Sequence, residues 1–200
     1  MSTREEILTR IRRNQPAPTV LPEVPAFDTA GAPPLERFKA GVERMGGKVV
    51  EAAAGERLEA LVARLYPEAK AVCSAADEVA GRRPDPARPP AELDDVEVGV
   101  VRAVFGVAET GSVWITQAEF RVSALGFLSQ HLVVLLDPAS IVGNLHHAYR
   151  ERAQFDAGYG VFMTGPSATA DIEGVLIHGA QGIRSLTVVL AGADPAATGR

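Results

Sequence analysis

Two uninterrupted apolar runs, residues 132–136 and 186–190, constrain the fold of this chain more than any other feature. A strand that is apolar at every position must be buried on both faces, as in a parallel sheet covered by helices. Amphipathic helices are predicted over residues 35–45 and 58–65, and each is followed by a short apolar strand. This order of elements predicts a doubly wound α/β domain with a mostly parallel sheet.

The remaining elements follow from periodicity and from turn residues. Asp137-Pro138 is a predicted N-cap and first-turn proline, and the helix after it has Ile141, Leu145 and Tyr149 on one face. The segment that begins at Thr164 is predicted to open a short helix. The predicted strands cover residues 48–50, 70–73, 96–101, 113–116 and 160–163, and the short helix covers residues 169–177.

The N-terminal part is predicted to be an arm. Residues 2–14 have capping-box spacing and a narrow apolar stripe, and residues 15–34 hold six prolines, which favour an extended linker. We therefore expect an N-terminal helical arm and linker over 1–34, one α/β domain over 35–191, and a tail over 192–200. Because an apolar stripe needs a partner, the arm is expected to dock on the body or to join subunits of a homo-oligomer.

Composition excludes several classes of function. The chain has 200 residues and a formal net charge of −5, so its net charge gives no electrostatic attraction to nucleic acid or to an anionic membrane surface. No segment approaches the roughly 20 apolar residues of a membrane span, and the N-terminus lacks the apolar core of a signal peptide. A cytoplasmic location is therefore expected.

Cysteine and histidine usage gives no sign of a metal or a disulfide. Cys73 is the only cysteine, and its apolar surroundings predict an inert core thiol. His146 and His147 are adjacent on a predicted helix, so their side chains point about 100° apart and do not easily share an ion. We expect no metal site and no cofactor in this chain.

The first candidate motif is the turn that contains Glu109, Thr110, Gly111 and Ser112. An acid between glycines, just before an apolar strand, costs free energy at the end of a sheet unless it has hydrogen-bond or charged partners. Gly111 permits a tight turn or a close approach of a ligand to the backbone. The alternative is an ordinary β-turn with an exposed glutamate.

The second candidate motif follows a predicted strand, and its site residues are Thr164, Gly165, Ser167, Thr169, Asp171 and Glu173. Ser167 and Thr169 could cap the predicted helix or donate hydroxyls to an anion there. Asp171 and Glu173 would repel a polyphosphate, so a small hydroxyl-bearing ligand or a protein partner fits better. The alternative is simply a well-capped helix.

The two motifs resemble those of the LUD-domain family, which is named for lactate utilization. The family patterns A-E-T-G-S and G-P-S-x-T-A-D-I-E are complete here, at residues 108–112 and 165–173. The family usually closes with G-V-H-G-P-R, whereas this chain has Gln181 in place of the histidine and Ile183 in place of the proline. Because an amide does not titrate, Gln181 could orient a ligand but could not act as an acid or base.

The resemblance implies a fold like that of the sugar-phosphate isomerase and coenzyme-A transferase group. It also implies a part in oxidising L-lactate to pyruvate alongside iron–sulfur partner proteins. One cysteine cannot hold such a cluster, so this chain would be a non-redox subunit or an accessory protein.

Two other functions stay open at this point. In coenzyme-A transferases of this fold group a turn glutamate attacks an acyl-CoA, and Glu109 is the acid in a comparable setting. The chain could instead be a binding module for a small organic acid, without chemistry of its own.

The two turns are expected to converge on one cleft. Gln181, Gly182 and Arg184, from the next turn, could complete it. Arg184 would be the natural partner of a substrate carboxylate, because its planar fork binds carboxylates with two hydrogen bonds. Alternatively, Arg184 pairs with a surface acid.

Overall fold

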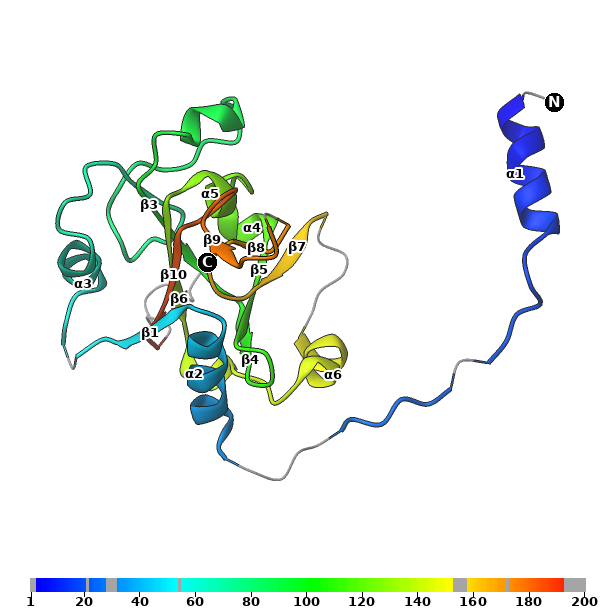
Figure 1. The fold of residues 1–200 in the computed structure, drawn as a ribbon, viewed down its shortest axis with the longest axis horizontal. Helices are drawn as coiled ribbons and strands as arrows, with labels where there is room; N and C mark the ends of the chain where they lie inside the picture. Colours follow the sequence, from blue (N-terminus) through cyan, green and yellow to red (C-terminus); the bar gives the residue numbers. More distant parts are fainter. Residues whose placement is uncertain are drawn as a thin grey trace.

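A five-stranded parallel sheet organises the body of the computed structural model, which describes residues 3–20, 22–27, 32–53, 55–152, 158–171 and 173–192 (Figure 1). The strand order is β1-β10-β6-β3-β2, and each neighbouring pair is parallel. The apolar runs at residues 132–136 and 186–190 lie in β6 and β10, which pair side by side in the sheet. The strands are β1 (Lys48–Glu51), β2 (Val72–Ser74), β3 (Val98–Arg102), β6 (His131–Leu136) and β10 (Ser185–Leu190).

Both faces of this sheet are covered, as a doubly wound fold requires. Along β6, Leu132, Val134 and Leu136 pack into the cluster that contains α2 (Pro34–Arg44). The alternate residues Val133 and Leu135 pack into the cluster that contains α3 (Leu58–Leu65). The predicted α/β fold with a parallel sheet is therefore confirmed.

A second sheet of three antiparallel strands lies beyond the first and was not predicted as a unit. Its order is β4-β5-β7, with β4 (Phe105–Val107), β5 (Ser112–Thr116) and β7 (Gly160–Met163). Strand β4 was missed altogether, because three residues between turns show no usable periodicity. Val113 and Ile115 of β5 join the α2 side of the core, while Trp114 packs with Phe105 on the other face.

The helix expected after Asp137-Pro138 is broken in the structure. Asp137 accepts a hydrogen bond from the Ala139 N–H at 2.9 Å, as predicted, but the turn that it caps ends at Ser140. Residue Val142 then bridges to Val107, and a new helical turn starts after Asn144, which caps it. The bridge from Val142 to β4 therefore interrupts the helix that the spacing of Ile141, Leu145 and Tyr149 predicts. The pieces are η2 (Pro138–Ser140), α6 (Leu145–His147) and η3 (Ala148–Arg152).

A hairpin occupies the place of the short helix predicted over 169–177, so that prediction is wrong. Strand β8 (Ala168–Thr169) pairs with β9 (Ile177–His178) in antiparallel fashion. Gly174 has φ +71° and Glu173 has φ +54°, and two successive left-handed residues reverse the chain and cannot continue a helix. Ile172 lies outside the described residues.

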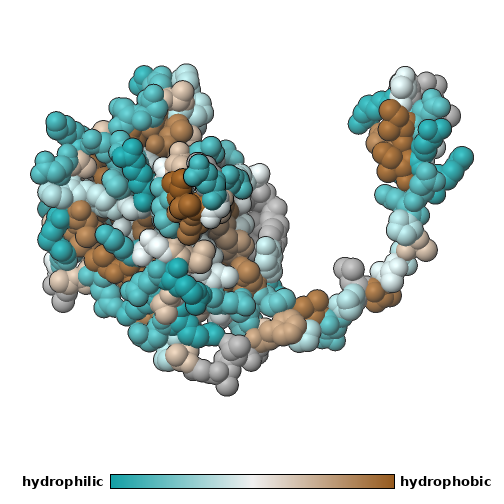
Figure 2. Space-filling model, viewed as in Figure 1, coloured by the Kyte–Doolittle hydropathy of each residue, from teal (hydrophilic) through white to brown (hydrophobic). Residues whose placement is uncertain are grey.

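The predicted N-terminal helix forms, and the described linker residues 16–20 and 22–27 contain no helix or strand. Helix α1 (Thr3–Arg13) has no buried residue, and Ile7 and Ile11 are more than half exposed. Figure 1 shows α1 apart from the body, and Figure 2 shows an apolar patch on its surface. That the arm docks on the body or joins subunits of a homo-oligomer stays a prediction. The tail from residue 193 onward lies outside the described residues.

Short helical segments complete the described chain. They are η1 (Pro90–Leu93), α4 (Gln117–Phe120) and α5 (Leu125–Leu128). Helix α4 has the capping box that pairs Thr116 with Glu119. No helix in the described part of the chain has the length and apolar character needed to cross a bilayer.

Candidate functional site

The first motif is a tight turn pressed against α2. Gly111 has φ +69°, and its N–H donates to the Val107 carbonyl at 2.9 Å. A Cβ on Gly111 would lie 2.3 Å from the Val42 backbone nitrogen, and one on Gly41 would lie 2.8 Å from the Gly111 nitrogen. Only glycine at both positions lets the turn and the helix approach this closely.

A chain of hydroxyls joins the two motifs. The Thr110 and Ser112 hydroxyls lie 2.7 Å apart, and the Ser112 hydroxyl is also hydrogen-bonded to that of Thr164. The contact follows from strand pairing, since Val113 of β5 is opposite Met163 of β7. The turns at 109–112 and at 164–167 therefore meet, and the shared cleft expected between them stays a prediction.

The second motif begins with a turn that also closes on α2. Gly165 is buried with φ +66°, and a Cβ there would lie 2.1 Å from the Met45 carbonyl oxygen. Ser167 is fixed by backbone bonds on both sides. Its N–H donates to the Ile183 carbonyl at 3.0 Å, and its carbonyl accepts from Gly179 at 2.7 Å. Both motifs thus meet the same end of one helix.

The segment that holds Gln181, Gly182 and Arg184 packs beside this turn but opens away from it. A Cβ on Gly182 would touch that of Ser167 at 3.0 Å. Gln181 and Arg184 are exposed, and Arg184 makes no ion pair within the described residues. Arg184 directly precedes β10, so it stands at the amino end of the parallel sheet.

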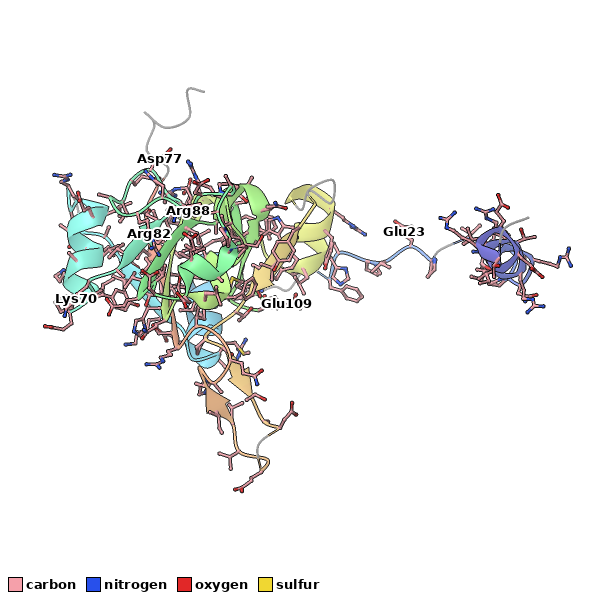
Figure 3. The ribbon with its side chains drawn as sticks, turned by 90° about the horizontal axis from the view of Figure 1, so that it is seen from above. Glu23, Lys70, Asp77, Arg82, Arg88 and Glu109 are labelled. Carbon is pink, nitrogen blue, oxygen red and sulfur yellow. The ribbon has the colours of Figure 1, made fainter. Side chains whose placement is uncertain are left out.

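The far half of the second motif leaves the body entirely. Figure 3 shows the β8–β9 hairpin projecting away from the body, whereas Glu109 lies on the body itself. Asp171 and Glu173 are exposed at the tip, and Thr169 caps only the local turn through the Asp171 N–H at 3.4 Å. Because there is no helix here, Ser167 and Thr169 neither cap a helix nor present hydroxyls to an anion at its N-terminus. The structure does not bring Asp171 and Glu173 together with Glu109.

Glu109 lines a pocket of about 290 Å³ that sequence reasoning did not anticipate. Its carboxylate Oε2 accepts a hydrogen bond from the Leu145 N–H at 3.1 Å, and its side chain is exposed. Arg44 reaches the Glu109 carbonyl oxygen through Nη2 at 3.5 Å. The pocket is lined by Phe27, Arg37, Ala40, Arg44, Ala108, Glu109 and Asn144.

The two arginines of this pocket come from one helix. Arg37 and Arg44 are seven residues apart on α2, which is two turns, so they lie on the same side. Arg37 also donates to the Gly143 carbonyl at 3.3 Å. That spacing was visible in the sequence, but nothing there showed that the Glu109 turn would pack beside it. The result is one carboxylate and two guanidinium groups around a small space.

Neither cysteine nor histidine contributes a second chemistry to this pocket. Cys73 is fully buried in β2, and burial raises the pKa of its thiol, as expected for an inert core residue. Among the described residues no three His, Cys, Asp or Glu side chains are grouped as a metal would need. The chemistry that the pocket offers is ion pairing and hydrogen bonding to a small polar ligand.

Comparisons with known proteins agree with this fold. The model of the LUD domain matches residues 90–191, half of the chain, and this range contains both motifs. The crystal structure of a DUF162 family protein from Deinococcus radiodurans superposes with a TM-score of 0.57 and 18% identity, covering 80% of this chain and 96% of that protein. The search of curated proteins gave no match. The chain belongs to the LUD domain family.

Proposed function

We propose that this protein is a non-redox component of an L-lactate utilization system and that it binds a small organic acid in the Glu109 pocket. The observation that carries the proposal is the charge arrangement of that pocket, in which Glu109 faces a space also lined by Arg37 and Arg44. A guanidinium group is the side chain best suited to pair with a carboxylate.

The groups of a 2-hydroxy acid match this arrangement. The carboxylate of the acid would pair with Arg44, which is the last residue of α2 and is exposed. Its hydroxyl would donate to the Glu109 carboxylate, which the Leu145 N–H holds in place. An acid without the hydroxyl would give Glu109 no hydrogen bond from the ligand, and a site built to bond a hydroxyl discriminates against ligands that lack it.

The electron-transfer step is assigned to partner proteins. Iron–sulfur clusters are held by several cysteine thiolates, whereas this chain has one cysteine. That cysteine is buried, and burial raises the pKa of its thiol. We therefore propose that iron–sulfur subunits accept the electrons and that this subunit binds and presents the acid.

Ligand binding by the purified chain tests the first part. L-lactate at a hundred times its dissociation constant should stabilise the protein by about 2.7 kcal/mol, seen as a raised melting temperature. Propionate, which lacks the hydroxyl, should give a smaller shift. Arg44→Met should abolish the response, and Glu109→Gln should remove the preference for lactate over propionate. Arg88→Met, at an exposed ion pair with Glu92, is the matched control.

Two outcomes would overturn the proposal. If no 2-hydroxy acid shifts the melting temperature, the Glu109 pocket is not an acid site. If the purified chain alone oxidises lactate with a dye acceptor, the non-redox assignment fails. If the partner assignment is right, the protein should co-purify with cysteine-rich iron–sulfur proteins. A failure to co-purify from cells grown on lactate would count against the assignment.

A second candidate function rests on the exposure of Glu109. An exposed carboxylate oriented by one N–H could attack a thioester carbonyl, forming an acyl-glutamyl anhydride and releasing the coenzyme-A thiolate. Incubation with short acyl-CoAs followed by mass spectrometry of the Glu109 peptide separates the two functions. An adduct that is absent in Glu109→Gln favours the transferase, and none is expected for the organic-acid subunit.

A further inference from the structure

A second pocket, larger than that of Glu109, lies at the carboxyl end of the parallel sheet. It measures about 450 Å³ and shares no lining residue with the Glu109 pocket. Its walls come from the ends of three parallel strands and from the start of α3. Ligands in open α/β sheets bind at this edge, because the loops that leave the carboxyl ends of the strands form a crevice there. The lining residues are Ala52, Glu56, Arg57, Leu58, Glu78, Arg102, Leu190, Ala191 and Gly192.

A partly buried ion pair in this pocket leaves one donor unused. Arg102, the last residue of β3, donates from Nε to the Glu78 carboxylate at 2.6 Å. The two side chains are only 24% and 14% exposed. The Nη2 nitrogen of Arg102 is buried and has no hydrogen-bond partner among the described residues. Nε and Nη2 form one edge of the guanidinium fork, so Glu78 occupies half of an edge that suits a two-oxygen acceptor.

The other acid of the pocket is already neutralised. The Glu56 carboxylate accepts from the Ala53 N–H at 3.1 Å and from Arg64 at 2.9 Å. These bonds, the backbone one first, hold the pKa of Glu56 below its usual range. Glu56 therefore stays ionised and directed at its own loop and at Arg64, and it does not compete for Arg102.

The start of α3 adds further donors on the same side. Arg57 stands at the N-cap position and makes no side-chain cap, so the first N–H groups of α3 are not used by a capping side chain. Gly55 in the preceding loop has φ +77° and open space where a Cβ would be. Exposed backbone N–H groups at a helix start favour negative charge. By itself this would be an ordinary helix end, but here it borders a pocket that also holds a half-used guanidinium.

We propose that this pocket binds a compact oxyanion, the carboxylate or phosphate group of a small metabolite, with Arg102 as its principal ligand. The oxyanion displaces Glu78 and takes the Nε–Nη2 edge of the guanidinium, which becomes accessible when Glu78 moves away. Glu78 then has a defined role, because it competes with the ligand for Arg102. A pocket of several hundred cubic ångströms also has room for the rest of a small metabolite.

Opposite effects of the two ion-pair partners test the proposal. The probes are inorganic phosphate and acetate, titrated at constant ionic strength into ¹⁵N-labelled full-length protein and followed by backbone amide shifts. We expect phosphate, acetate or both to shift the amides of residues 57–59. Arg102→Gln should weaken that binding at least tenfold, whereas Glu78→Gln should strengthen it several-fold because the competitor is gone.

Matched controls come from the exposed Arg88–Glu92 ion pair, whose N–O distance is 2.6 Å. Arg88→Gln and Glu92→Gln should leave the titration unchanged. If Arg102→Gln does not fold, Arg102→Lys keeps the charge but loses the fork, and it should still bind several-fold more weakly than wild type. Comparison of the phosphate and acetate arms decides which anion the pocket prefers.

Three results would overturn the proposal. One is an absence of amide shifts near residues 57–59 with both probes. Another is Arg102→Gln or Arg102→Lys binding as tightly as wild type. The third is weaker binding by Glu78→Gln, which would show that the Glu78–Arg102 pair only holds the loops in place. The result is independent of the lactate response, because Arg44→Met removes that response and should leave phosphate binding unchanged.

Discussion

Residues 164–167 and residues 168–178 are contiguous, and the second motif runs from the first segment into the second, yet the two segments differ in how they pack. The first part is pinned between α2 and the segment at 179–184, with Gly165 buried against Met45. The second part projects as a hairpin whose tip residues Val175 and Leu176 are 58% and 59% exposed. The motif therefore begins in a packed turn and ends in an exposed hairpin, and we expect mutations in these two segments to have different effects on stability.

The largest expected effect separates two glycines that share a backbone conformation. Gly165→Ala should lower the free energy of unfolding by roughly 3 kcal/mol or more, from left-handed strain and from the clash with the Met45 carbonyl. Gly174→Ala, in the hairpin, has φ +71° but open space, so it should cost only about 1–2 kcal/mol. Denaturant unfolding of both variants measures the difference. Equal losses would mean that the close approach to α2 does not matter.

A smaller effect is expected for the hydroxyls that join the two motifs. Ser112 is 4% exposed and bonds to Thr164, so Ser112→Ala should cost about 1–2 kcal/mol by leaving that hydroxyl without its partner. Thr164→Val should cost a similar amount. The double variant should cost less than the sum, because the two residues share one bond. Additive losses in the double-mutant cycle would show that the contact contributes nothing.

The free energy of unfolding should depend on pH through His131, which contacts the strand that follows the hairpin. Ser185, the first residue of β10, is hydrogen-bonded to His131 Nδ1 at 2.7 Å. Burial, and then the charge of Arg184, lowers the pKa of His131 below its ordinary value of 6.5, against an opposing effect of Glu97. Between these two pKa values the unfolded chain binds more protons, so stability is lost as the pH falls below 6.5.

His131→Gln provides the comparison for this pH dependence. Between pH 7 and pH 5 the free energy of unfolding of wild type should fall more steeply than that of the variant, measured by urea unfolding at each pH. Parallel curves would show that His131 titrates alike in the folded and unfolded chains. The Arg88→Gln variant, in the turn before η1 and not in β6, should follow wild type.

Much of the parallel sheet could be predicted from sequence, because its signals are local. The runs at 132–136 and 186–190 are apolar at every position, and glycine or proline ends the neighbouring helices. The hairpin could not be predicted in this way. Strands of two residues have no periodicity, and the Ser167 and Thr169 hydroxyls that suggest a helix cap suit a turn equally well.

The candidate site was predictable only in part, for a related reason. The meeting of Ser112 and Thr164 follows from two strands beside two turns, and both strands were predicted. Arg37 and Arg44 gain their position from the packing of Gly111 on Gly41, and Arg102 gains its position from the ends of strands that are distant in sequence. A single sequence shows which residues carry charge, but the tertiary contacts decide which charges share a pocket.

The smallest expected effect concerns the hairpin tip. Val175→Ser with Leu176→Ser should change the free energy of unfolding by no more than about 0.5 kcal/mol, because exposed side chains away from packed contacts contribute little. The same pair of changes in the buried strand, Val188→Ser with Val189→Ser, should prevent folding. If the tip variant loses several kcal/mol, Val175 and Leu176 are covered in solution, and the contrast between the two halves of the motif breaks down. Measuring the loss at several protein concentrations then identifies the cover, since a second copy of the chain would make the effect concentration-dependent.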